Sequence, residues 1–156
     1  MQSPPRALSL IRGIGGHMLH LQKLCVGAVS VEDLTDWQHS QRHRWPAGTA
    51  IHVTRMWPKR EADMQGGSLY WVIKGLILCR QRILGFEEAR GDDGILRCAI
   101  HLDREVVLTE SIPRRAFQGW RYMEAADAPR DLVKGRARED SIPADMARAL
   151  AEMGLR

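Results

Sequence analysis

The sequence lacks the patterns that would identify an exported, membrane-spanning or zinc-stabilised protein. Its three cysteines, Cys25, Cys79 and Cys98, are widely spaced and form no CxxC pair, which argues against a disulfide framework or a structural zinc site. Each lies in an apolar, strand-like run, so we interpret them as buried thiols in a reducing compartment. No apolar run approaches the roughly 20 residues of a membrane span, and no signal-peptide pattern is present. These absences predict a cytoplasmic protein with no membrane contact.

Signatures of common catalytic sites are also missing. The sequence has no GxSxG motif, no P-loop and no dinucleotide-binding fingerprint, since the glycines of GIGGH lack a preceding strand and a following helix. His39 and His43 have the spacing of a zinc-protease helix, but Ser40 replaces the required glutamate, and His101 with Asp103 forms only a short HxD pair. We therefore predict no metal site and no cofactor. Enzymatic activity stays undecided, with a protein that is not an enzyme favoured.

Size and charge favour one compact domain with an anionic partner. The chain of 156 residues, 44% apolar and 27% charged, suffices for a single domain with its own core. A net charge of +4 and an isoelectric point near 9.3 favour polyanionic ligands without identifying one. Residues 42–82 contain eight Lys or Arg against two acids, and residues 113–123 add three arginines and no acid. Residues 83–112 carry a net charge of −4, so folding either separates a basic from an acidic face or interleaves them.

Hydrophobic periodicity predicts one helix and several strands. Ser30 can cap the amide of Asp33, and apolar residues at three- and four-residue spacing follow until Pro46, which indicates a helix of about three to four turns. Lys74 and Gly75 are predicted to turn a hairpin, although Gly75 could instead mark a bulge in one bent strand. A second hairpin is predicted at residues 91–94. Strands are predicted at residues 20–26, 51–56, 68–73, 76–88, 95–102 and 105–109.

These elements divide the chain into four parts and define an α+β class. Residues 1–17 are predicted to be a disordered leader, although the apolar LSLI within them could form a short strand. Residues 18–123 form the predicted domain, a small curled, mostly antiparallel sheet or partial barrel with an N-terminal helix. Residues 124–140 are polar without periodicity, which predicts a linker. Residues 141–156 are predicted to form a C-terminal helix.

Two segments combine basic and aromatic residues, HVTRMWPKR with the strands after it, and RRAFQGWRYM at residues 114–123. Single-stranded nucleic acid is bound by such residues, because cations contact phosphates and rings stack on bases. Basic residues that alternate with apolar ones also occur on the solvated face of a half-buried strand. Trp37 and Trp71 are predicted to lie in the core, whereas Trp57 and Trp120 fit core and surface about equally. The candidate ligand-binding residues are Arg55, Trp57, Lys59, Arg60, Arg80, Arg82, Arg115, Trp120, Arg121 and Tyr122.

Four long segments resemble one family: MLHLQKLCVGAVSVEDLTDWQ, HVTRMWPKR, GGSLYWVIKG followed by RQRIL, and PRRAFQGWRYM. This alphaproteobacterial family is catalogued as domain of unknown function fourteen eighty-nine, and the resemblance runs from about Met18 to Leu155. It implies no activity and no catalytic residue. The helix followed by curled strands also resembles, more weakly, the RNA-binding barrel of the pseudouridine-synthase-and-archaeosine-transglycosylase type. That resemblance implies a nucleotide pocket between barrel and helices.

Three functions remain open from the sequence. The basic and aromatic segments favour a domain that binds an anionic ligand such as RNA or a nucleotide. The same surface would suit a small enzyme acting on a phosphorylated or nucleotide substrate. It would also suit an interaction module that docks an acidic protein partner and uses the C-terminal helix. The oligomeric state is not indicated by any pattern.

Overall fold

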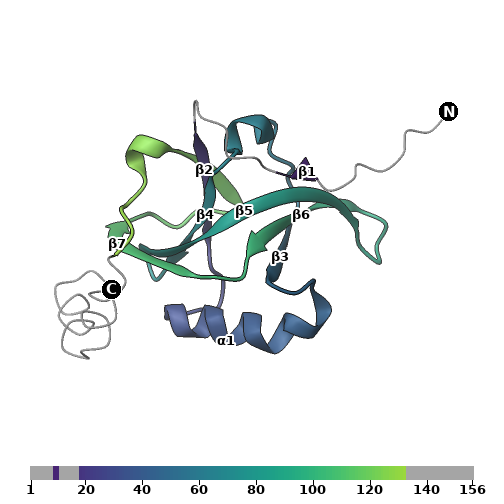
Figure 1. Ribbon diagram of the computed structural model, residues 1–156, viewed down its shortest axis with the longest axis horizontal. Helices are drawn as coiled ribbons and strands as arrows, with labels where there is room; N and C mark the ends of the chain where they lie inside the picture. Colours follow the sequence, from purple (N-terminus) through teal and green to yellow (C-terminus); the bar gives the residue numbers. More distant parts are fainter. Residues whose placement is uncertain (1–8, 11–17, 133–156) are drawn as a thin grey trace.

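The computed structural model describes residues 9–10 and 18–132, drawn in colour in Figure 1. One α-helix, α1 (Val31–Gln41), and three short 3-10 turns, η1 (Arg42–Arg44), η2 (Glu61–Met64) and η3 (Ala125–Asp127), occur in this part of the chain. Its strands are β1 (Ser9–Leu10), β2 (Leu19–Leu24), β3 (Thr49–Thr54), β4 (Ser68–Ile73), β5 (Leu76–Arg90), β6 (Leu96–Asp103), β7 (Val107–Pro113) and β8 (Trp120–Glu124).

Helix α1 begins where the capping pattern predicts. The Asp33 amide donates to the Ser30 hydroxyl oxygen at 3.1 Å, and Asp33 in turn accepts from the Val29 amide at 2.8 Å. Glu32 and Asp33 lie in the first turn, where the partial positive charge of the helix end favours acids. The helix lies against one side of the sheet, as Figure 1 shows, and buries Leu34 and Gln38.

The strands form one open, mixed sheet. Its order is β3-β6-β5-β4-β2-β8, with β1 and β7 paired to β5 off this path. Strand β2 runs parallel to β4, and the other pairs of described strands are antiparallel. The long β5 joins the parts, since its first half pairs with β4 and β7 and its second half with β6 and β1. Figure 1 shows β5 crossing the molecule.

Strand β4 is buried on both faces, which separates the core into two clusters. Leu69, Trp71 and Ile73 belong to the larger cluster beneath α1, whereas Tyr70 and Val72 belong to a smaller cluster on the opposite face. The predicted alternation of this strand is therefore confirmed. Its uninterrupted burial reflects a position inside the sheet, between β5 and β2, with side chains covered on each side.

The two predicted hairpins are confirmed. Lys74 and Gly75 have φ angles of 51° and 80°, the positive values that a two-residue type I′ turn requires, and Ile73 pairs with Leu76 across it. The second hairpin joins β5 to β6 at residues 91–95. There the Asp93 side chain accepts from the Ile95 amide at 3.0 Å and pairs with Arg97 at 2.9 Å.

Two expectations about the core have opposite outcomes. Trp71 is 3% exposed, as predicted. The prediction for Trp37 is wrong, because its side chain is 53% exposed and contacts Trp45 with ring centroids 5.8 Å apart. The buried side of α1 carries Gln38 instead. Gln38 and Gln81 donate to each other at 2.9 and 2.8 Å, so a satisfied amide pair occupies the place expected for an apolar side chain.

Residues at both ends of the described chain contact the sheet. Ser9 and Leu10 pair with Phe86 and Gly85, so a short strand does occur within LSLI. Residues 125–132 fold back on the sheet, where Asp131 forms a bridge with Thr109. The predicted C-terminal helix lies outside the described residues, and closure into a barrel is not confirmed. Within the described residues, no helix is long and apolar enough to cross a membrane.

Candidate functional site

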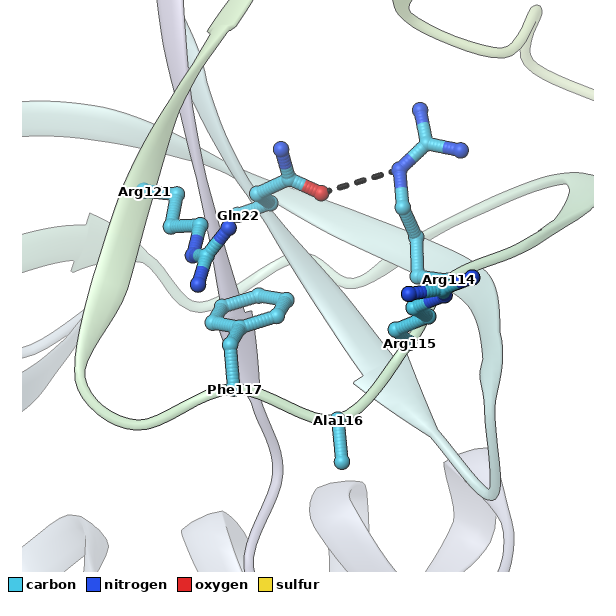
Figure 2. Close-up of a pocket in the computed structure, with 6 residues that line it drawn as sticks. All are labelled: Gln22, Arg114, Arg115, Ala116, Phe117 and Arg121. Carbon is cyan, nitrogen blue, oxygen red and sulfur yellow. Dashed lines mark hydrogen bonds between the residues drawn. The ribbon is translucent and has the colours of Figure 1, made fainter.

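A basic hollow lies beside β8, on the face of the sheet opposite α1. It encloses about 420 Å³ and is lined by Gln22, Arg114, Arg115, Ala116, Phe117 and Arg121, which we call the arginine hollow. Figure 2 shows the Phe117 ring between Arg121 and Arg115, with Gln22 above it. Among these described lining residues, three are arginines and none is acidic. Such a surface favours an anion, because each guanidinium offers several N–H donors at fixed geometry.

Arg114 is held in place by its neighbours. Its Nε donates to Gln22 Oε1 at 3.0 Å, the dashed contact in Figure 2, and its Nη1 donates to the Pro113 carbonyl at 2.9 Å. The Arg114 amide donates to the Gly75 carbonyl at 2.8 Å, so the β4–β5 turn positions this arginine. Gln22 is fixed in turn, because its Nε2 donates to the Tyr122 carbonyl at 3.3 Å. The hollow is thus partly pre-formed.

Arg121 and Arg115 are exposed and reach the hollow from opposite sides. The Arg121 guanidinium lies 5.0 Å from the centre of the Phe117 ring, within the range of a cation–π contact. Phe117 itself packs against the smaller core cluster, which anchors the ring. A guanidinium plane and an aromatic ring are the two surfaces on which nucleic-acid bases stack. The hollow therefore brings guanidinium groups and an aromatic ring to one surface.

A second hollow lies on the other face of the same strands. It encloses about 510 Å³, and we call it the Trp120 hollow after the aromatic residue that lines it. It differs from the first in having exposed apolar side chains, since Val53 is 47% and Met56 is 66% exposed. Arg97 is neutralised there by Asp93. The lining consists of Lys23, Val53, Thr54, Arg55, Met56, Arg97, Gln118, Gly119 and Trp120.

The two basic and aromatic segments of the sequence meet at this second hollow. Trp120 Nε1 donates to the Met56 carbonyl at 2.9 Å, and the Arg60 amide donates to the Tyr122 hydroxyl at 3.2 Å. The Arg60 guanidinium also lies 5.7 Å from the Tyr122 ring centre. Residues 56–60 are therefore joined to β8. The three candidate cations of this segment, Arg55, Lys59 and Arg60, are exposed, and Arg60 pairs with Asp63 at 3.0 Å.

Trp57 packs against the core of the domain. Its ring is half-buried, packs on the larger core cluster and lies 6.1 Å from Phe86. Its Nε1 donates to Glu61 at 3.0 Å. Trp120 is also half-buried and contacts Tyr122 edge-on with ring centroids 4.9 Å apart, but it lines a hollow. Of the two tryptophans that the sequence left undecided, Trp120 is the one placed beside an open surface.

Arg80 and Arg82 line neither hollow. Arg80 forms a bidentate pair with Asp131, its Nε and Nη2 donating at 2.7 and 2.6 Å, and its Nη1 donates to the Ser68 hydroxyl at 2.9 Å. Its charge is therefore compensated within the domain. Arg82 is exposed on the same face of β5. Four of the ten candidate residues line the hollows, Arg115 and Arg121 the first and Arg55 and Trp120 the second. Arg60 and Tyr122 contact each other beside them.

Several lining residues were not among the candidates from the sequence. Arg114 and Phe117 belong to the basic and aromatic segment RRAFQGWRYM, so the pattern that indicates binding included them, although they were not named as candidates. Gln22 stands at an inward position of β2, and a polar residue there is a usable signal for a buried contact. Lys23 lines the Trp120 hollow, and burial lowers its pKa from the usual 10.5. Val53 and Met56 carried no signal, because exposure of apolar residues cannot be predicted from the pattern.

Burial shifts the pKa values of two histidines and one cysteine in favour of their neutral forms. Burial, with the charge of Arg80, lowers the pKa of His20 to about 4, and burial, with Lys23, lowers that of His52 to about 4. Burial raises the pKa of the Cys25 thiol to about 11, and all three cysteines are free. In the described part of the chain, no group of three or more His, Cys, Asp or Glu is placed to hold a metal ion.

These observations define the class of protein as a small α+β domain with a mixed sheet. The last strand of that sheet has a basic hollow on one face and an apolar, aromatic hollow on the other. Residues 21–156 match the model of a family described as protein of unknown function (DUF1489), and the chain belongs to this family. The predicted membership of domain of unknown function fourteen eighty-nine is thereby confirmed. No match was found among the curated proteins or the solved structures.

Proposed function

We propose that the domain binds single-stranded RNA, or a nucleotide unit of it, through the arginine hollow. The observation that supports this most directly is the lining itself, in which Arg114, Arg115 and Arg121 surround the Phe117 ring and no described lining residue is acidic. Phosphates pair well with guanidinium groups, and charge-assisted hydrogen bonds are roughly twice as strong as neutral ones. The neutral amide of Gln22 adds a group that can contact a base or a ribose.

The ring among the cations favours a single strand over a duplex. A base can stack on Phe117 or on the Arg121 guanidinium only when it is not already stacked in a helix. Such stacking contributes about 1 to 3 kcal/mol per base in proteins that bind single strands. A duplex would offer only its phosphates to the same surface. The aromatic component therefore separates the two ligands.

The remaining candidates extend this surface in our proposal. Arg55 and Lys59 belong to the segment that Trp120 and Tyr122 join to β8, and they add positive charge that attracts a polyanion. Arg60 pairs with Asp63 at 3.0 Å, so it is proposed to add less of this charge. Arg82 is proposed to contribute only to this long-range attraction, and Arg80 is proposed to contribute little to it, because Asp131 compensates its charge. Trp57 is proposed to support the segment without contacting the ligand, since its ring packs on the core.

The test is RNA binding by an Arg115→Gln and Arg121→Gln double variant. Both side chains are exposed, so the substitutions leave the core intact. We expect affinity for a labelled single-stranded oligomer, measured by fluorescence anisotropy, to fall about tenfold per arginine. The slope of log K against log salt should also become shallower by about 1.4, because each phosphate contact on a single strand contributes roughly 0.7.

A matched control is Arg42→Gln with Arg44→Gln. These exposed arginines of η1 line neither hollow, and the double change removes the same charge. Equal losses in both double variants would mean that only net charge matters, which contradicts a site at the arginine hollow. Displacement of the RNA by polyglutamate at an equal charge concentration would indicate an acidic protein partner instead.

A further inference from the structure

We infer that the Trp120 hollow is a second subsite on the same RNA strand and that it receives an unstacked nucleobase, while the arginine hollow holds the backbone phosphates. The inference rests on the proposed function. Beyond the proposed function, it states which part of the RNA each hollow binds and how one strand reaches both hollows.

Both hollows are built from one short stretch of chain. Residues 114–117 and Arg121 line the arginine hollow, and the intervening residues 118–120 line the Trp120 hollow. Arg121 and Trp120 are neighbours on β8, so their side chains leave opposite faces of the strand. They pair with Gln22 and Lys23 on β2, each of which lines the same hollow as its partner. The two sites are thus separated only by the thickness of the sheet.

The edge of the sheet provides the connection. Among the described strands, β8 is the last in the order, and no further described strand pairs with its outer edge. Gly119, with φ 70°, turns the chain just before β8, and a Cβ atom built there would meet nothing within 4 Å. A flexible single strand can therefore pass around this edge and contact both faces. A rigid duplex cannot follow such a turn.

The lining of the arginine hollow complements the phosphate of a nucleotide, and the lining of the Trp120 hollow complements its base. The arginine hollow presents cations, whereas the Trp120 hollow presents the exposed side chains of Val53 and Met56 beside an indole. The Trp120 ring is held in one orientation, because Nε1 donates to the Met56 carbonyl and the ring meets Tyr122 edge-on. Bases bind to apolar and aromatic surfaces of this kind. Arg55 and Lys23, which also line this hollow, suit the adjoining phosphate.

The experiment compares a base-containing with a base-free polyanion. The probes are a single-stranded oligoribonucleotide of about 12 residues, within the site sizes of single-strand binders, and inorganic polyphosphate of matched charge. The variant is Val53→Thr with Met56→Gln, which removes exposed apolar surface without changing charge and keeps the Met56 carbonyl that Trp120 uses. We expect RNA affinity to fall roughly tenfold. Polyphosphate affinity should stay unchanged.

Two further proteins complete the design. Val26→Thr removes a valine that is 84% exposed and lines neither hollow, and we expect it to leave both affinities unchanged. Arg115→Gln with Arg121→Gln should weaken RNA and polyphosphate alike. A Val53→Thr and Met56→Gln protein that binds RNA normally, or that loses both probes equally, overturns the inference and leaves the proposed function standing. An arginine double variant that binds RNA normally overturns the proposed function itself.

Discussion

His52 is a half-buried imidazole whose Nε2 atom is fully buried, and we expect it to make the protein sensitive to acid. It meets Trp71 edge-on with ring centroids 5.1 Å apart, and its Nε2 has no hydrogen-bond partner among the described residues. Burial and the nearby Lys23 charge lower its pKa from 6.5 to about 4. The unfolded chain therefore takes up a proton near pH 6.5 that the folded protein resists until about pH 4. The stability that is linked to neutral His52 is therefore fully present above about pH 6.5, and it is lost as the pH falls from there to about pH 4.

A His52→Phe variant tests this directly. The phenyl ring keeps the contact with Trp71 and removes both the unpartnered nitrogen and the titration. We expect a melting temperature at least equal to wild type at about pH 7.5 and a smaller drop on acidification to about pH 4.5. His20 continues to titrate, so part of the drop remains. The control is His43→Gln, an exposed imidazole whose loss should leave the acid sensitivity as it is; an unchanged drop in His52→Phe would contradict the assignment.

The fate of Trp37 shows where reasoning from single residues fails. Its spacing from Leu34 placed it on the apolar stripe of the helix, yet it is exposed and Gln38 is buried. The reason is the partner: Gln81 on β5 accepts from Gln38 and also from Trp71 Nε1, at 2.9 and 2.8 Å, and donates to the Asp103 carbonyl at 3.0 Å. A polar side chain can occupy a core when every group is satisfied. Such pairing depends on a residue 43 positions away, which no local pattern reports.

Among the elements, the β4–β5 hairpin carries a strain that can be removed. Lys74 has φ 51°, in a region that is costly for a side chain with a Cβ atom, and an Asn-Gly pair is the preferred sequence for this turn. We expect Lys74→Asn to raise the free energy of unfolding in urea by about 0.5 kcal/mol. Lys74→Gln removes the same charge and keeps the strain, so it should show no gain. A gain in both would assign the effect to charge.

Elements with local signals were predictable, and elements with distant partners were not. The cap at Ser30, the alternation of β4 and the Lys74-Gly75 turn each lie within a few residues of their cause. The parallel pairing of β2 with β4 was not foreseen, because the chain between them contains α1 and β3, and no residue of either strand encodes the choice of neighbour. The path of residues 125–132 also escaped detection. Their attachment includes backbone hydrogen bonds, such as Glu110 to Arg130 and Leu132 to Leu108, which leave no periodicity in the sequence.

At the scale of the whole molecule, the sequence located both basic segments but not their arrangement. Because successive side chains of a strand point to opposite faces of the sheet, Arg121 and Trp120 lie on opposite faces of β8. That β8 is an edge strand depends on its pairing with β2, whose Gln22 is 99 positions from Arg121. Arg80 was a candidate binding residue from the sequence, because its partner Asp131 lies in the polar segment interpreted as a linker. The contact with Asp131 is what removes it from the binding surface.

The pair of Arg80 and Asp131 also fastens residues 125–132 to the sheet, which gives the last prediction. The hydrogen bonds from Arg80 hold the pKa of Asp131 below its usual 3.8. The pair therefore contributes stability above the unfolded-state pKa, and this contribution is lost as the pH falls through the lowered folded-state value. Since the Asp131 side chain is 42% exposed, solvent screening limits the contribution to about 1 kcal/mol at neutral pH.

We expect Asp131→Asn to lower the free energy of unfolding in urea by that amount near neutral pH. The difference from wild type should shrink toward zero in acid. Asp127→Asn, an exposed carboxylate of the same segment, serves as the control and should match wild type at every pH. A deficit for Asp131→Asn that stays constant from neutral to acid pH would assign the loss to local packing and not to the ion pair.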